Sequence, residues 1–108
     1  KMDAQRKKGV LDILVLSVLT TGPSYGYEII QRVSGVMEVS ESTMYPILRR
    51  LENGKDVETY SQEYNGRIRK YFSITEKGRE RIAEFLEEWD EMKAIYEFVR
   101  LAVISENP

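Results

Sequence analysis

Cysteine and histidine are both absent from the 108 residues of the sequence. Without cysteine there is no disulfide framework, no thiolate nucleophile and no zinc–thiolate site. Without histidine the chain lacks the commonest general base and the commonest metal ligand. An enzyme with this sequence would depend on carboxylates, Lys or Tyr alone. We therefore expect a protein that is not an enzyme, with no catalytic residues, no metal site and no cofactor.

Long apolar runs are absent as well. No stretch reaches the roughly 18 apolar residues that indicate a membrane-spanning helix, and residues 1–5 hold no apolar signal core. We expect a cytoplasmic protein that does not bind membranes. What the sequence does contain, 42% hydrophobic and 31% charged residues, is ordinary for one folded, soluble domain.

Charge is distributed unevenly along the chain. The net charge is −2, but residues 1–73 carry 11 Lys and Arg against 9 Asp and Glu, whereas residues 74–108 carry 5 against 9. A mildly basic first part and an acidic last part suit a protein with one DNA-facing side.

Two helices are predicted near the start of the chain. Residues 5–20 are apolar on nearly every side after the first turns, so this helix must be buried. Gly22 and Pro23 end it, because glycine suits a left-handed cap and proline cannot continue a helix. Ser24 is expected to cap the second helix, which runs to about Ser34.

A third helix is predicted from about Ser40 or Ser42 to Asn53. On its outward face Arg49 can bond a guanine bidentately or clamp a phosphate. The hydroxyls of Ser42 and Thr43 at the helix N-terminus also suit a phosphate, although simple N-capping explains them equally well. The predicted inward stripe is Met44, Ile47, Leu48 and Leu51, and the outward face is Ser42, Tyr45, Pro46 and Arg49.

A two-stranded antiparallel wing is predicted after the third helix. Residues 57–62 and 69–74 are rich in aromatic and β-branched side chains, and they flank Asn65 and Gly66, the strongest short hairpin signal. Three cations within four residues of the tip repel one another, which favours phosphate binding over a merely solvated basic tip. These cations are Arg67, Arg69 and Lys70.

The last predicted helix is capped by Thr75 and runs to about Ser105. Its apolar residues follow alternating three- and four-residue steps, an a/d seam sustained for about three heptads. Packing within the chain explains the first part of the seam. Residues 92–103 would then leave an apolar stripe in water, so we expect a homodimer. The seam consists of Ile82, Phe85, Trp89, Met92, Tyr96, Val99 and Val103.

This order of elements predicts a mainly α fold with a small β-hairpin (α+β). A winged helix-turn-helix domain covers residues 1–74, and a long dimerisation helix over residues 75–108 packs on the same single domain. In such folds the third helix enters the major groove, so we predict sequence-specific binding to double-stranded DNA. One alternative is a winged helix that binds only proteins, which the basic residues of the third helix and wing argue against. The other is an enzyme that uses carboxylates of the last helix, where a solvated charged surface is the better explanation.

Three segments together resemble the PadR family of bacterial transcriptional regulators: GPSYGYEI at residues 22–29, TMYPILRRLE at residues 43–52 and GRIRKYFSITEKG at residues 66–78. The single C-terminal helix is similar to the short subfamily. The resemblance implies a homodimeric repressor of palindromic promoter sites, whose C-terminal helices pack against the partner's N-terminal helix region. It also implies release by small molecules such as phenolic acids or planar drugs. The positions that match the family's DNA-binding residues are Tyr25, Ser42, Thr43, Tyr45, Pro46 and Arg49, with Gly66, Arg67 and Lys70 in the wing.

One departure from the family pattern concerns the entry to the wing. After the third helix the family usually has a glycine followed by an apolar residue. Here Gly54 stands one place earlier, and Asp56 occupies the place of the apolar anchor. The packing and the angle of the wing depend on how the chain accommodates this change.

Trp89 is the one tryptophan and lies at the centre of the seam. The resemblance implies that short members hold flat ligands at the dimer centre between aromatic side chains. Paired indoles near a two-fold axis would then sandwich a planar aromatic or phenolic effector. Leu86 and Lys93 lie one turn to either side and would line the same cavity. A tryptophan that simply fills the interface is the alternative.

Overall fold

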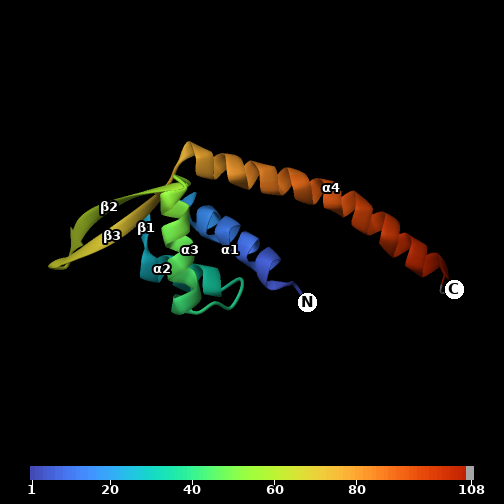
Figure 1. The fold of residues 1–108 in the computed structure, drawn as a ribbon, viewed down its shortest axis with the longest axis horizontal. Helices are drawn as coiled ribbons and strands as arrows, with labels where there is room; N and C mark the ends of the chain where they lie inside the picture. Colours follow the sequence, from blue (N-terminus) through green and yellow to red (C-terminus); the bar gives the residue numbers. More distant parts are fainter. Residues whose placement is uncertain (107–108) are drawn as a thin grey trace.

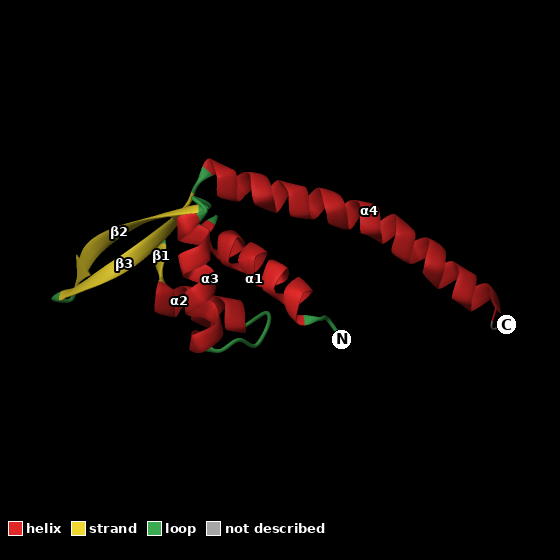
Figure 2. Cartoon of the chain, in the orientation of Figure 1, coloured by secondary structure: helices red, strands yellow, loops and turns green. Residues whose placement is uncertain are grey.

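The computed structural model describes residues 1–106, which form four helices and one three-stranded antiparallel sheet in strand order β1-β3-β2 (Figures 1 and 2). The predicted α+β winged-helix architecture with a long C-terminal helix is confirmed. The last two residues of the predicted dimerisation region, Asn107 and Pro108, lie outside the described part. In chain order the elements are α1 (Ala4–Leu19), β1 (Ser24–Tyr25), α2 (Gly26–Ser34), α3 (Glu41–Asn53), β2 (Val57–Tyr64), β3 (Arg67–Ile74) and α4 (Glu76–Glu106).

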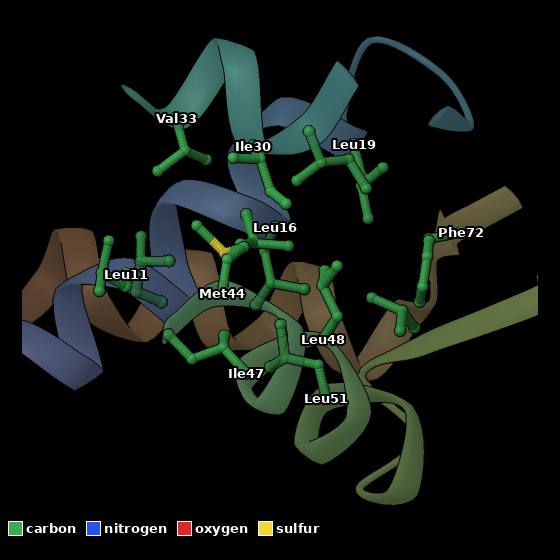
Figure 3. Packing of buried hydrophobic residues seen from close by; sticks show 14 residues of the cluster. Leu11, Leu16, Leu19, Ile30, Val33, Met44, Ile47, Leu48, Leu51 and Phe72 are labelled. Carbon is green, nitrogen blue, oxygen red and sulfur yellow. The ribbon is translucent and has the colours of Figure 1, made fainter. Parts of the chain in front are cut away.

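The hydrophobic core lies where α1, α2 and α3 meet the inner face of the sheet. Leu16 of α1 is fully buried near the centre, with Met44 and Leu48 of α3 close to it (Figure 3). Burying each such side chain contributes about 1.5–3 kcal/mol. The predicted inward stripe of α3 is confirmed, because all four members are at most 3% exposed: Met44, Ile47, Leu48 and Leu51.

The chain enters α2 through a short strand, and the predicted cap at Ser24 is wrong. Ser24 and Tyr25 form β1, which pairs with Phe72 and Tyr71 of β3. The Ser24 hydroxyl donates to Oε1 of Glu28 at 2.8 Å, and α2 begins one residue after Tyr25. Pairing with β1 satisfies backbone groups that an isolated hairpin would leave open at the β3 edge. The sheet therefore has three strands where the sequence predicts two.

The hairpin is longer than predicted. Asn65 and Gly66 form a two-residue turn with φ values of 51° and 77°, and pairing starts directly beside it at Tyr64 and Arg67. Positive φ at both central residues is the geometry of a type I′ turn, which matches the twist of the strands that it joins. Strand pairing can therefore extend to the very tip of the wing.

The entry to the wing is held by polar contacts rather than an apolar anchor. Lys55 adopts a left-handed conformation with φ 66°, whereas Gly54 stays right-handed at φ −81°. The next residue, Asp56, is 6% exposed and forms an ion pair with Arg81 of α4 at 3.1 Å. Val57, 1% exposed, supplies the apolar contact one place later. The shifted glycine thus leaves the core intact and ties the wing to α4.

Helix α4 begins beside the entry to the wing and then extends away from the hydrophobic core. Thr75 caps it as predicted, because its hydroxyl oxygen accepts from the backbone N–H of Gly78 at 3.1 Å. Ile82 and Phe85 pack against the core, and the helix continues far beyond it. The chain consequently measures 66 × 27 × 21 Å, with the wing and α4 pointing in opposite directions (Figure 1). None of the helices among residues 1–106 is both long and apolar enough to cross a bilayer.

Candidate nucleic-acid interface

The outward face of α3 carries the residues that the sequence predicts there. Ser42, Tyr45, Pro46 and Arg49 are all exposed. The cap of the helix is Ser40, whose hydroxyl oxygen accepts from the backbone N–H of Thr43 at 3.3 Å. Capping is therefore not the role of Ser42 or Thr43. Their hydroxyls stay beside an exposed helix N-terminus, which favours anions.

Tyr45 also has a structural contact. Its Cε1 atom lies 3.1 Å from the position that a Cβ on Gly26 would occupy, so the tyrosine ring rests on the first residue of α2. The side chain remains 40% exposed. Tyr45 thus packs between α3 and the start of α2 and still exposes part of its side chain.

The wing separates its cations onto two faces. Arg69 is sandwiched by tyrosines, with its guanidinium carbon 4.3 Å from the ring centre of Tyr25 and 4.6 Å from that of Tyr64. Tyr25 in turn meets Tyr71 edge to face, with ring centres 5.7 Å apart. Tyr25 is therefore half-buried in an aromatic cluster of the sheet, beside α2 rather than on the outward face of α3. Cation–π contacts of this kind fix the direction of Arg69.

Lys70 is on the other face and has an acidic partner that the sequence analysis missed. Its ammonium donates to Oε1 of Glu52 at 2.9 Å, and the Thr59 hydroxyl donates to Oε2 at 2.8 Å. These hydrogen bonds, that of Lys70 first, lower the pKa of the Glu52 carboxyl below its ordinary value. Glu52 thus supplies a counter-anion within the chain for Lys70. Its place at the end of α3, next to the wing, was the available signal.

Arg67 is the exposed cation at the tip itself. It sits beside Gly66 in the turn and forms no ion pair with any residue between 1 and 106. A guanidinium in this position meets a phosphate without first breaking an internal bond. The three tip cations therefore differ: Arg67 is open, Arg69 is stacked and Lys70 is paired.

The predicted seam of α4 divides at Trp89. Before it, Ile82 and Phe85 pack on the core. From Trp89 onward the side chains are about half exposed, and Phe85 and Trp89 lie tilted with ring centres 6.2 Å apart. A groove between α1 and α4 is lined by both of these rings and by Met92; Leu86 and Lys93 are not among its lining residues. The exposed seam members are Trp89, Met92, Tyr96, Val99 and Val103.

Comparisons with known proteins agree with this arrangement. The model of the transcriptional regulator PadR-like family matches residues 15–84. An uncharacterised protein of Lysinibacillus sphaericus is 34% identical over 93 residues, covering 82% of this chain and 85% of that protein. A Streptococcus transcriptional regulator has a TM-score of 0.80 at 31% identity, with 91% of this chain and 99% of the other covered. The PadR-like transcriptional regulator of Bacillus cereus has a TM-score of 0.76 at 32% identity, with 89% and 96% covered.

The family match covers the winged helix from Val15 of α1 to the end of β3, together with the first turns of α4. We call the winged helix, α1 to β3, the reading head. This membership also supports the expectation of a protein that is not an enzyme. The chain belongs to the PadR-like family of transcriptional regulators, and it is a DNA-binding regulator of transcription.

Proposed function

We propose that this chain acts in the cytoplasm as a homodimeric repressor on a palindromic promoter site, and that a planar aromatic or phenolic effector releases it. The observation that carries the proposal is the exposed seam of α4, which extends beyond a reading head with an open α3 face. A single copy presents one such face. Two copies joined along α4 present two, as a palindrome requires.

The exposure along α4 supports pairing. Trp89, Met92 and Tyr96 are 47%, 45% and 62% exposed, and Ile95 and Phe98 on neighbouring faces are 53% and 77% exposed. A helix that is apolar over most of its circumference is stable in water only when other surfaces cover it. Pairing of α4 with a second copy would cover these side chains.

We assign sequence reading to α3 and duplex anchoring to the wing. Arg49 and Tyr45 are exposed where a helix in the major groove meets base edges, and Ser42 and Thr43 lie where the helix N-terminus meets a phosphate. Arg67 at the tip contacts phosphate only. Lys70 contacts a phosphate only after its ion pair with Glu52 has been broken.

Two substitutions test this division. The duplex is first enriched from a random-sequence library with the wild-type protein. Arg67→Ala is then expected to weaken binding to enriched and random duplexes alike, with the slope of log K against log salt reduced by about one. Arg49→Ala is expected to lose about 1–3 kcal/mol more on the enriched duplex than on random DNA. Equal losses on both duplexes for both variants would contradict it.

The effector proposal rests on the groove beside Phe85 and Trp89. Two tilted rings and Met92 offer an apolar, partly enclosed surface for a flat guest. Titration of the homodimer with flat aromatic compounds is expected to quench or shift Trp89 emission and to weaken binding to the enriched duplex. An unchanged spectrum across the whole panel would leave Trp89 as a packing residue.

A further inference from the structure

Four charged side chains link the reading head to the base of α4. Asp12 of α1 is only 5% exposed, within a stretch of the helix that is otherwise apolar and buried. Its Oδ1 accepts from Nη2 of Arg50 in α3, and its Oδ2 accepts from Nη2 of Arg81 in α4 at 3.1 Å. Nη1 of Arg81 donates to Oδ2 of Asp56 at 3.1 Å, at the entry to the wing. Helices α1, α3 and α4 and the wing entry thus meet in one ion-paired network.

A contribution to stability does not by itself explain why these positions carry ion pairs rather than apolar side chains. Apolar residues of similar volume often replace buried ion pairs with no loss of stability. Oδ1 of Asp56 is buried and has no hydrogen-bond partner among residues 1–106, which is a further cost. What ion pairs add over apolar contacts is direction, because a planar guanidinium holds two carboxylates in fixed positions.

The charge on Arg81 is secured by its two partners. Burial alone would lower the pKa of the guanidinium, but the hydrogen bonds and charges of Asp12 and Asp56 raise the pKa above its ordinary value overall.

A small change at this network is amplified along α4. The helix has 31 residues, so it is about 46 Å long, and a tilt of about 5° at its base moves its far end by about 4 Å. In a homodimer joined along α4, the angle between α4 and α3 sets the distance between the two recognition helices. That distance has to match successive turns of the major groove.

We propose that Asp12 and Arg81 are specificity-determining positioning residues, which set the spacing between DNA half-sites by fixing α4 against α3. The inference rests on the homodimeric DNA binding proposed above. Asp12 is buried on α1, and Arg81 lies beside it on α4, away from the outward face of α3. Their loss therefore relaxes the spacing without removing a contact to DNA.

Arg81→Gln is the main test. It removes the guanidinium that binds the carboxylates of Asp12 and Asp56, and it leaves the ion pair of Asp12 with Arg50 in place. Arg79→Gln is the matched control, since it removes the same charge from an exposed position two residues away on the same helix. Affinities are measured for the duplex that the wild-type protein enriches, for the same duplex with one base pair inserted or deleted between half-sites, and for random DNA. Salt dependence is measured in parallel.

The wild-type protein and Arg79→Gln are expected to lose affinity on the order of tenfold for each inserted or deleted base pair. Arg81→Gln is expected to lose about threefold or less, with its random-DNA affinity and salt slope unchanged. Asp12→Asn is expected to show the same relaxed spacing. If Arg81→Gln does not fold, Arg81→Lys, whose compact ammonium cannot hold both carboxylates in the same way, is measured against the same expectation.

Wild-type spacing penalties in a folded Arg81 variant would overturn the inference. The proposed function fails in a different way, because the wild-type protein would then enrich a duplex with one half-site or none, and no spacing between half-sites would exist to be measured.

Discussion

At the scale of single residues, the entry to the wing shows how the chain tolerates an unfavourable backbone. Lys55 has φ 66°, a region in which a side chain with a Cβ is strained, and the neighbouring Gly54 does not use its freedom there. Asp56 follows and turns its carboxylate toward Arg81. The contacts of the neighbouring residues, such as the ion pair of Asp56 with Arg81, therefore keep Lys55 in its strained conformation.

Replacing Lys55 by glycine is expected to stabilise the fold by about 0.5–1 kcal/mol, because relief of left-handed strain exceeds the added flexibility of the unfolded chain. Chemical denaturation of wild type and variant measures the difference. Lys55→Ala is the control, since it removes the same charge and keeps the Cβ. An equal gain in both variants would trace the effect to charge rather than to the backbone.

Glu52 gives the protein a pH-dependent tie between α3 and the wing. Its pKa is lowered in the folded state, chiefly by the hydrogen bond from Lys70, so its contribution to stability is present above the unfolded pKa. It is lost as the pH falls through the folded pKa. Glu52→Gln is therefore expected to cost about 0.5 kcal/mol at pH 7 and progressively less as the pH is lowered below the unfolded pKa, in unfolding curves recorded across that range. A cost that does not depend on pH would exclude the ion pair as its source.

At the scale of elements, periodicity and turn chemistry predicted most of what the structure contains. The stripe of α3, the Asn65–Gly66 hairpin and the long last helix each follow from a local pattern that packing then reinforces. Strand β1 was missed because two residues carry no periodicity, and its pairing with Phe72 is a long-range event. The predicted cap at Ser24 was wrong for the same reason, because Ser24 pairs with Phe72 in the sheet and α2 begins only at Gly26.

The site was predictable to a similar extent. Exposure of Ser42, Tyr45 and Arg49 followed from the helical period of α3. The internal partner of Lys70 and the network around Asp12 were not foreseen, because ion pairs between distant segments depend on how elements pack. A charged residue within the apolar run of α1 was the one local sign of that network.

The contact between α4 and the wing entry depends on the absence of a side chain at Gly78. A Cβ there would overlap the backbone carbonyl oxygen of Asp56 and approach Cγ1 of Ile74 to 2.8 Å. Gly78→Ala is therefore expected to destabilise the fold by about 1–3 kcal/mol, as measured by thermal unfolding.

Gly9→Ala is the matched control for this substitution. Nothing lies within 4 Å of a Cβ at Gly9 in α1, and alanine favours a helix more than glycine does. A gain of about 0.5–1 kcal/mol is expected there. Stabilisation by Gly78→Ala would show that α4 and the wing entry are not in close contact at Gly78.

At the scale of the whole molecule, the two ends of the structure differ in how well their apolar side chains are buried. The reading head has its own core, whereas the second half of α4 is exposed on several faces, including Ile95, Phe98 and Leu101. The exposed side chains of α4 from Trp89 onward show that the helix extends past the core of the reading head. Pairing along it stays a prediction, because local patterns identify an apolar face but not what covers it.

A charge within the seam tests the pairing. Met92→Glu is expected to raise the dissociation constant of the homodimer about 100-fold or more, since the two copies together would bury two unpaired carboxylates at a combined cost of roughly 3 kcal/mol or more. Sedimentation equilibrium measures the shift, and affinity for the enriched duplex should fall further than affinity for random DNA. Glu87→Lys, an exposed position about half a turn from Trp89, should leave both unchanged. A wild-type protein that is monomeric at micromolar concentration would contradict the expectation at once.

The order of the core and α4 along the chain has a consequence for biosynthesis. During translation the N-terminal segments emerge first, so the core from Leu11 to Phe72 is available before the last turns of α4 have been made. A nascent chain can therefore fold its reading head before the exposed second half of α4 has been made. In the proposed homodimer, folding of each reading head would then precede pairing along α4.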